Sequence, residues 1–223
     1  MLGRSRPGAN LRRPLALGLH AQVQEPSMRL AAVLVLSLST AGPALAASAD
    51  WRADARRADV RRLERLDEAW TTALAEARAQ GQGRALTRLG VLADPRVSLP
   101  RPQPTPGAYR CRTVKIGSPN GGPGLVTYGW FRCRVALSPG GDLTLEKVTG
   151  SQRQAGNLYP EAPRRLVFLG AVAWGSGEGR AQYGRDAERD QIGVFERIGA
   201  DRYRLTLPWP HQESTLDLLE LRR

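Results

Sequence analysis

The stretch from His211 to Asp217 brings together residue types that could perform nucleophilic catalysis. It holds a histidine, Ser214 and an aspartate, the three members of a serine triad. Triad members meet through the fold and not through adjacency in sequence, and Gly175-Ser176-Gly177 lacks the spacing of a nucleophile elbow. We therefore predict that no residue of this chain is catalytic and that His211 lies on a surface loop.

A second group that could do chemistry is the acidic cluster Asp186, Glu188 and Asp190. Paired carboxylates perform glycoside hydrolysis, and carboxylate clusters bind Ca²⁺. These three alternate with arginines, which favours a solvated loop that neutralises its own charge. The nearby glycines of residues 175–179 lack the lysine of a phosphate loop and are expected in a hairpin loop. We predict neither a metal site nor a cofactor.

The stretch Thr149–Pro160 is unusual because it is small and polar, with a single arginine and a single tyrosine. Such residues could line the mouth of a barrel and bind a polar ligand. The alternative is a strand of modest propensity whose glycines let it bend at a barrel corner. The candidate ligand-binding residues are Ser151, Gln152, Arg153, Tyr159 and Tyr183.

The two cysteines, Cys111 and Cys133, lie in matching contexts, each between two arginines. Two cysteines in strands of an exported domain should form one disulfide, since neither a redox spacing nor a metal-ligand set is present. If the two strands were simple hairpin neighbours, Arg110 would face Arg134 and Arg112 would face Arg132, and like charges directly opposite are destabilising. Three explanations stay open: the strands are not neighbours, carboxylates such as Glu146 neutralise the arginines, or the candidate anion patch is formed by Arg110, Arg112, Arg132 and Arg134.

The whole chain is strongly basic, with a net charge of +12 over 223 residues. Of its 33 basic residues only Lys115 and Lys147 are lysines, a bias that fits a GC-rich genome. Nucleic-acid surfaces interleave basic and aromatic residues on one face. Because genome composition accounts for the basic bias and the chain is expected to be exported, we expect no nucleic-acid partner.

The segment 28–46 has the three parts of a secretory signal peptide: a basic start, an apolar run and an Ala-x-Ala site ending at Ala46. The apolar run is too short to span a bilayer comfortably. We expect translation to start at Met28, with residues 1–27 as a misassigned extension, and the cleaved chain to reach the periplasm or the medium without a transmembrane segment.

Two kinds of periodicity follow the leader. Apolar residues at three- and four-residue steps predict one helix over residues 50–80 and a shorter one over Arg84–Leu92. Alternating prolines over residues 99–107 predict a stiff extended connector. Period-two patterns then predict seven short strands: Tyr109–Ile116, Trp130–Leu137, Asp142–Val148, Arg165–Trp174, Gln191–Ile198, Arg202–Leu207 and Thr215–Leu221.

These elements predict an α+β fold that is mainly β. A helical hairpin (47–98) and the connector (99–107) precede an antiparallel up-and-down meander (108–223) that forms a small barrel or a sandwich. One hairpin can be placed in register around Gly140. Its predicted pairs are Leu137 with Leu143, Val135 with Leu145, and Arg134 with Glu146.

An ordered set of short motifs runs along the chain: Leu63 with Ala69-Trp70, Leu89-Gly90, Asp94-Pro95, Pro106–Arg112, Phe131–Arg134, Thr149–Arg153, Leu158–Pro160, Phe168–Gly170, Tyr183-Gly184, Arg189-Asp190, Glu196–Gly199 and Glu213-Ser214 with Leu216-Asp217. This set resembles an exported proteobacterial family, domain of unknown function 4893, over about residues 51–223. The resemblance implies export and a disulfide-linked β-rich domain, and it implies no reaction and no catalytic residue. A weaker likeness in topology links the meander to small periplasmic protease-inhibitor barrels, which is an analogy of fold alone.

The sequence therefore favours a non-enzymatic periplasmic β-barrel that binds an envelope protein or a small polar ligand, with a protease-inhibitor-like module as one form. The first alternative is a cell-envelope hydrolase that uses carboxylates. The second is an envelope-structural protein that binds anionic lipid or glycan. A buried pair of acids at a concave site favours the hydrolase, and a filled barrel favours the binding module.

Overall fold

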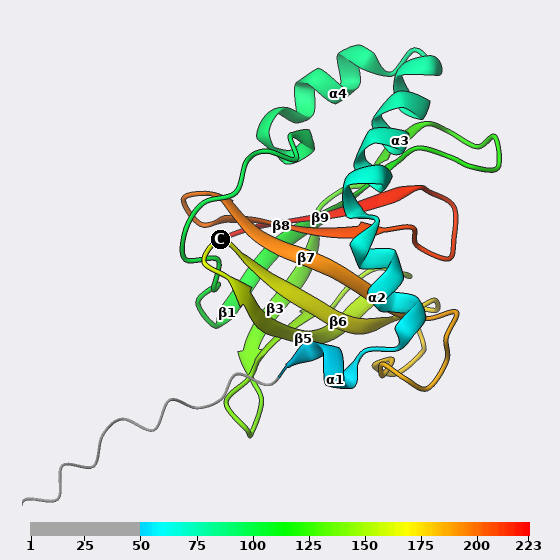
Figure 1. Ribbon diagram of the computed structural model, residues 1–223. Helices are drawn as coiled ribbons and strands as arrows, with labels where there is room; N and C mark the ends of the chain where they lie inside the picture. The colour runs from blue at the N-terminus through cyan, green and yellow to red at the C-terminus, as the bar shows by residue number, and fades with distance from the viewer. Residues whose placement is uncertain (1–49) are drawn as a thin grey trace, which may run out of the picture. The chain divides into compact units, whose positions relative to one another are not determined.

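The structure, a computed structural model, describes residues 50–223, and the predicted leader and N-terminal extension lie outside them. Its sheet is antiparallel throughout, and each strand from β3 to β9 pairs with the next along the chain (Figure 1). Pairing of β1 with both β3 and β9 closes these strands into an eight-stranded barrel, and short β2 extends from β1. The strands are β1 (Gly107–Ile116), β2 (Leu125–Thr127), β3 (Phe131–Leu137), β4 (Leu143–Lys147), β5 (Arg153–Ala162), β6 (Arg165–Ala173), β7 (Asp190–Gly199), β8 (Arg202–Pro208) and β9 (Leu216–Arg222).

The mainly β class and the seven strands predicted from alternation are confirmed, with ends within two residues. The predicted hairpin register is confirmed at all three pairs, from Leu137–Leu143 to Arg134–Glu146. The stretch Thr149–Pro160 contains strand β5, as its alternative interpretation expected. A Cβ at Gly156 would lie only 2.4 Å from the carbonyl oxygen of Leu169, so the close approach of β5 and β6 requires a glycine there.

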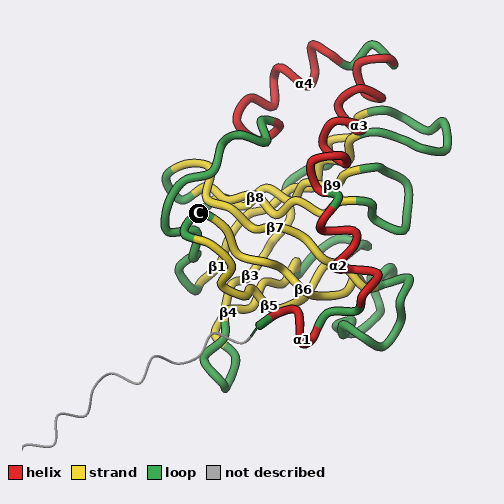
Figure 2. The backbone as a smooth tube through the Cα atoms, in the orientation of Figure 1, coloured by secondary structure: helices red, strands yellow, loops and turns green. Residues whose placement is uncertain are grey.

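The expected single helix over residues 50–80 is wrong. The segment forms α1 (Trp51–Asp54), α2 (Arg57–Glu64) and α3 (Leu66–Ala79) (Figure 2). The first break has a tertiary cause: extended Arg56 donates its backbone N–H to the Tyr183 hydroxyl at 2.8 Å, and its guanidinium lies 2.9 Å from Asp190. The second predicted helix is α4 (Gly83–Leu89) followed by a 3₁₀ turn, η1 (Gly90–Ala93).

Apolar side chains fill the barrel interior, because every second residue of each strand points inward. At the centre of this core, the Phe195 and Tyr203 rings stack with their centroids 5.5 Å apart. The buried interior residues are Tyr109, Cys111, Cys133, Val135, Leu145, Leu158, Leu166, Phe168, Phe195, Tyr203, Leu205, Leu207, Leu219 and Leu221.

The helices cover part of the outer surface of the barrel and bury a second apolar layer there. α3 packs against β1, β8 and β9, and α2 lies along β7 (Figure 1). Fully buried Arg204 on β8 joins the segment after α4 to the barrel: its guanidinium bonds Glu196 and lies 5.1 Å from the centre of the Trp70 ring. It also donates to the backbone carbonyl oxygens of Val91, Leu92, Asp94 and Val97.

The disulfide between Cys111 and Cys133 is confirmed, with the two Cα atoms 5.8 Å apart. The register considered for a simple hairpin is wrong by two residues: Arg110 lies opposite Arg132, and Cys111 lies opposite Phe131. A two-residue turn between β1 and β3 would fix their register. The actual connection is long and contains β2, so the register is not set by a turn.

Candidate functional site

One end of the barrel interior is polar, and we call it the mouth. The alternation that buries Leu145, Leu158 and Leu219 continues there with charged and amide side chains, all at least nine-tenths buried. The loops β4–β5 (148–152), β6–β7 (174–189) and β8–β9 (209–215) meet over this end. The inward polar residues are Thr113, Lys115, Lys147, Gln154, Gln191 and Asp217.

The only two lysines of the chain, Lys115 and Lys147, both lie in the mouth. Lys115 Nζ is 2.9 Å from Asp217 and 3.3 Å from Glu213. Burial alone would lower the pKa of Lys115, but the Asp217 and Glu213 carboxylates together more than offset this, and the pKa is raised. Lys115 is thus the cation of a buried ion pair.

Lys147 lies in a different environment. Its Nζ donates to the Gln152 carbonyl at 2.9 Å and to the Thr113 hydroxyl at 3.4 Å, and it sits 4.1 Å from the centre of the Phe131 ring. Within residues 50–223 no carboxylate lies at ion-pair distance from it. Burial, and after it the charge of Lys115, lowers the pKa of Lys147 from 10.5 to about 8.

Lys147 should therefore contribute stability that grows with pH as the folded protein loses its proton. Between pH 8 and pH 10.5 the unfolded chain keeps a proton that the folded chain has lost, so the contribution of Lys147 to the free energy of unfolding increases by roughly 2 to 3 kcal/mol. A Lys147→Met variant lacks this term and should be more stable than the wild type at pH 7, by about 1 to 2 kcal/mol. Urea unfolding of both proteins at pH 7, 8, 9 and 10 measures the difference.

The control for this experiment is Arg88→Met, which removes an exposed cation from α4. Tyrosines with raised pKa values, such as Tyr183, destabilise the fold as the pH approaches their unfolded-state pKa of about 10. They do so equally in all three proteins, so the difference between the wild type and Lys147→Met reports on Lys147. Parallel stability profiles for wild type and Lys147→Met would show that the buried amine does not titrate in this range.

Two amide oxygens in the mouth lack a hydrogen-bond partner within the described residues: Oε1 of Gln154 and Oε1 of Gln191. Buried polar groups are normally paired, so such atoms mark places where water or a ligand binds. A pocket beside Gln191 has a free volume of about 20 Å³, which holds about one water molecule. Its lining includes Lys115, Gln191 and Asp217.

The rim of the pocket is formed by residues of the three loops. His211 lies beside Glu188, with Nδ1 3.6 Å from the carboxylate oxygen, and Trp174 and Gln152 complete the rim. The β8–β9 loop has a left-handed backbone at Trp209 (φ 48°) and at Glu213 (φ 69°), neither of them glycine. Such conformations are strained and persist where the surrounding structure imposes them.

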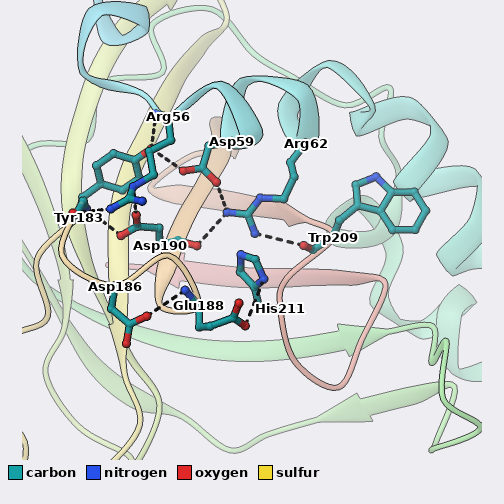
Figure 3. A network of polar contacts seen from close by, with 10 residues as sticks. Arg56, Asp59, Arg62, Tyr183, Asp186, Glu188, Asp190, Trp209 and His211 are labelled. Atoms are coloured by element: carbon teal, nitrogen blue, oxygen red, sulfur yellow. Dashed lines mark hydrogen bonds and ion pairs between the residues drawn. The ribbon is translucent and has the colours of Figure 1, made fainter.

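A polar network imposes that loop geometry from α2 (Figure 3). Arg62 donates to the Trp209 carbonyl at 3.2 Å and to the Asp190 carbonyl at 2.8 Å, and it also pairs with Asp59. Asp59 in turn accepts the Tyr183 hydroxyl proton. The network thus fixes the β6–β7 and β8–β9 loops, which carry the rim, against one helix.

The five candidate ligand-binding residues do not form one site and lie in three different parts of the molecule. Ser151 lies in the β4–β5 loop, and Gln152 lines the pocket of the mouth. Arg153 bonds the carbonyls of Gly150, Gly175 and Glu178 and so connects two loops. Tyr159 and Tyr183 lie outside the barrel, against Asp54 of α1 and Asp59 of α2.

The acidic cluster of the β6–β7 loop is spread over different environments. Asp190 is buried against Arg56, Asp186 is exposed, and Glu188 stands on the rim beside His211. In the described part of the chain, no three histidine, cysteine or acidic side chains form a group that could hold a metal ion. His211 lies on an exposed loop, as predicted.

The four arginines of the candidate anion patch lie on the outer surface of β1 and β3. Arg112 pairs with Glu220 at 2.6 Å, and Arg134 with Glu146 at 3.0 Å, as the charge-neutralisation alternative expected. Arg110 lies over Trp130, 4.6 Å from the ring centre. Arg132 is exposed and has no ion pair within residues 50–223.

Sequence reasoning missed the mouth residues Lys115, Lys147, Gln154, Gln191 and Asp217. A signal was present: the chain's only lysines fall at inward positions of strands that were correctly predicted. Genome composition accounts for the arginine bias, but it does not account for the two lysines at these inward positions.

Fold and site together define a closed, eight-stranded antiparallel β-barrel with a helical layer on its outside and a charged mouth. The chain belongs to the family described as Domain of unknown function (DUF4893), whose model matches residues 51–221. No curated protein and no solved structure matches the chain. Among residues 50–223, no helix combines the length and apolarity needed to cross a membrane.

Proposed function

We propose that this chain is an exported, non-enzymatic binding module whose barrel mouth binds a small polar ligand by an anionic end. The observation that carries the proposal is the Lys147 ammonium, buried in the mouth without a carboxylate partner among residues 50–223. A buried charge without a counter-charge is strongly unfavourable. An anion bound in the mouth would supply the missing charge.

The neighbouring side chains fit a ligand of this chemistry. Lys147 and Lys115 offer ammonium donors, and Thr113 offers a hydroxyl. The unpaired amide oxygens of Gln154 and Gln191 accept hydrogen bonds, so they fit a hydroxyl of the ligand next to its anionic group. Charge-assisted hydrogen bonds, such as those from the two ammonium groups, are about twice as strong as neutral ones.

The size of the mouth places the ligand at the rim. Apolar side chains fill the barrel below the lysines, and the free volume beside Lys115 fits about one water. Only a small anionic group enters, and the remainder of the ligand lies against Trp174, Gln152 and His211. The filled barrel also favours a binding module over a hydrolase, whose carboxylate pair would need an open concave site.

Export is supported by the disulfide between Cys111 and Cys133, since such bonds persist in oxidising compartments. It fits the signal-peptide pattern of residues 28–46 and a periplasmic or secreted location. The bacterial origin that the family resemblance implies is part of the same proposal.

The proposal is tested by thermal unfolding with small anions as probes: acetate, glutamate, citrate, phosphate and sulfate, with glucose as the uncharged control. A probe at 100 times its Kd should stabilise the protein by about 2.7 kcal/mol, which raises Tm by roughly 5–10 °C. In Lys147→Met, whose fold is expected to be stable, the affinity should fall about 10- to 100-fold.

The matched control is Arg84→Met, which removes an exposed cation from α4 and should bind like the wild type. Native mass spectrometry of protein purified without denaturation adds a direct search for a co-purified ligand. A wild type that carries no bound mass and responds to none of the anions would contradict the proposal. So would equal binding by Lys147→Met.

A further inference from the structure

Four arginines form a continuous row across the outer surface of the barrel, which we call the arginine ladder. Arg132 on β3 lies directly opposite Arg110 on β1, Arg110 lies opposite Arg222 on β9, and Arg222 lies opposite Arg202 on β8. Neighbouring strands are about 4.8 Å apart, so the ladder places the backbone of one arginine at about that interval over four strands. Arg110 and Arg132 are exposed, and the other two are partly exposed.

The ladder is unfavourable for the isolated fold, because like charges directly opposite each other repel. A carboxylate offsets this repulsion in only one half of the ladder. The buried Glu220 carboxylate accepts hydrogen bonds from Arg202 and Arg222 and from Arg112 in the next row. Although burial alone would raise the pKa of Glu220, bonds from Arg222 and Arg112 lower it, so it stays ionised.

The other half of the ladder, Arg132 and Arg110, has no carboxylate at ion-pair distance in the described residues. Three arginines surround one aromatic ring, that of Trp130. The guanidinium carbon of Arg110 lies 4.6 Å from the ring centre, that of Arg112 5.0 Å and that of Arg222 5.5 Å. Trp130 itself is 41% exposed. Stacking fixes the guanidiniums in place without neutralising them.

We infer that the arginine ladder and Trp130 form a docking surface for a linear acidic polysaccharide that carries sulfate or carboxylate groups. Charge complementarity supports an anionic partner, since one surface row offers four guanidiniums. The repeated spacing fits a partner with charges at regular intervals along a chain.

The curvature of the barrel selects the polysaccharide over a lipid surface. The ladder crosses four consecutive strands of a closed barrel, so its members follow a curved surface. A flexible linear chain can follow that curve and contact all four arginines. A flat bilayer touches a curved surface only along a narrow line, where it meets one or two of them.

The test uses dextran sulfate as the probe and two double variants, Arg110→Gln/Arg132→Gln in the ladder and Arg84→Gln/Arg88→Gln on α4 as the control. Both variants remove two positive charges from exposed positions. The ladder variant should bind dextran sulfate at least about tenfold more weakly at physiological salt, with a shallower salt dependence. The control should bind like the wild type.

Thermal unfolding distinguishes a structural role of these arginines from a role in polysaccharide binding. Because the ladder variant loses like-charge repulsion, its Tm should equal or exceed that of the wild type. A lower Tm in the ladder variant together with unchanged dextran sulfate binding would overturn the inference.

Three further probes distinguish other partners. Uncharged dextran should not bind, and vesicles with phosphatidylglycerol and single-stranded DNA should bind more weakly than dextran sulfate. Equal losses in the ladder and control variants would show a general charge effect and overturn the docking surface. Preferential binding to the vesicles or the DNA would overturn the choice of partner. Lys147→Met should bind dextran sulfate normally, which keeps this surface distinct from the mouth.

Discussion

Replacement of Arg204 by leucine is expected to destabilise the protein by about 3–5 kcal/mol. The Arg204 side chain is fully buried, and its guanidinium bonds the Glu196 carboxylate and four backbone carbonyls of the segment after α4. Leucine would fill part of the volume but leave Glu196 without its cation and the carbonyls without donors. For a domain of this size, Tm should fall by roughly 10–15 °C.

Urea unfolding measures the loss, with Arg88→Leu on the exposed face of α4 as the matched control. Hydrogen exchange adds a spatial prediction: protection should fall first in residues 83–97, which Arg204 holds to the barrel, and later in β5 and β6. A loss below about 1 kcal/mol would contradict the role of Arg204 as the main polar connection between the two layers.

Replacement of Asp217 by leucine is expected to cost about 3 kcal/mol, because it leaves the Lys115 ammonium buried with only the exposed Glu213 as its partner. The Ser214 hydroxyl, which donates to Asp217, loses its acceptor as well. The double variant Lys115→Met/Asp217→Leu removes both charges and should recover most of the loss.

A double-mutant cycle over Lys115 and Asp217 isolates their interaction. The expected coupling energy is about 2 kcal/mol, measured by urea unfolding at pH 7. Simple additivity of the two single losses would show that the pair is not coupled. The double variant also separates stability from binding, since it keeps Lys147 and should still respond to small anions, although more weakly.

The strands could be predicted from the sequence because their pattern is local. Alternation between Arg134, Val135 and Leu137 indicates both the strand and its face, and a turn at Gly140 fixes the hairpin register. β2 was missed because three residues are too few to show a period. The first helix break was missed because Arg56 leaves the helical conformation to bond Tyr183, more than 120 residues away.

The mouth could not be predicted in the same way, because it depends on barrel closure. Pairing of β1 with β9 brings Lys115 beside Asp217, although the two are 102 residues apart in sequence. No local sequence pattern predicts that contact. Tyr159 was expected near the ligand, yet its neighbour Leu158 points inward, so alternation turns Tyr159 to the outside. Once the strands are known, the same rule places Lys147 inside.

The most direct test of the mouth as a binding site is NMR of protein labelled with ¹³C at the lysine ε-carbon. The chain has only two lysines, so the spectrum contains two side-chain signals, and Lys147→Met assigns them. We predict that the Lys147 signal titrates with a pKa of about 8, and that a bound anion shifts this signal and raises the pKa. If an anion saturates the protein while both lysine signals and the Lys147 pKa stay unchanged, the ligand binds elsewhere and the mouth is not the binding site.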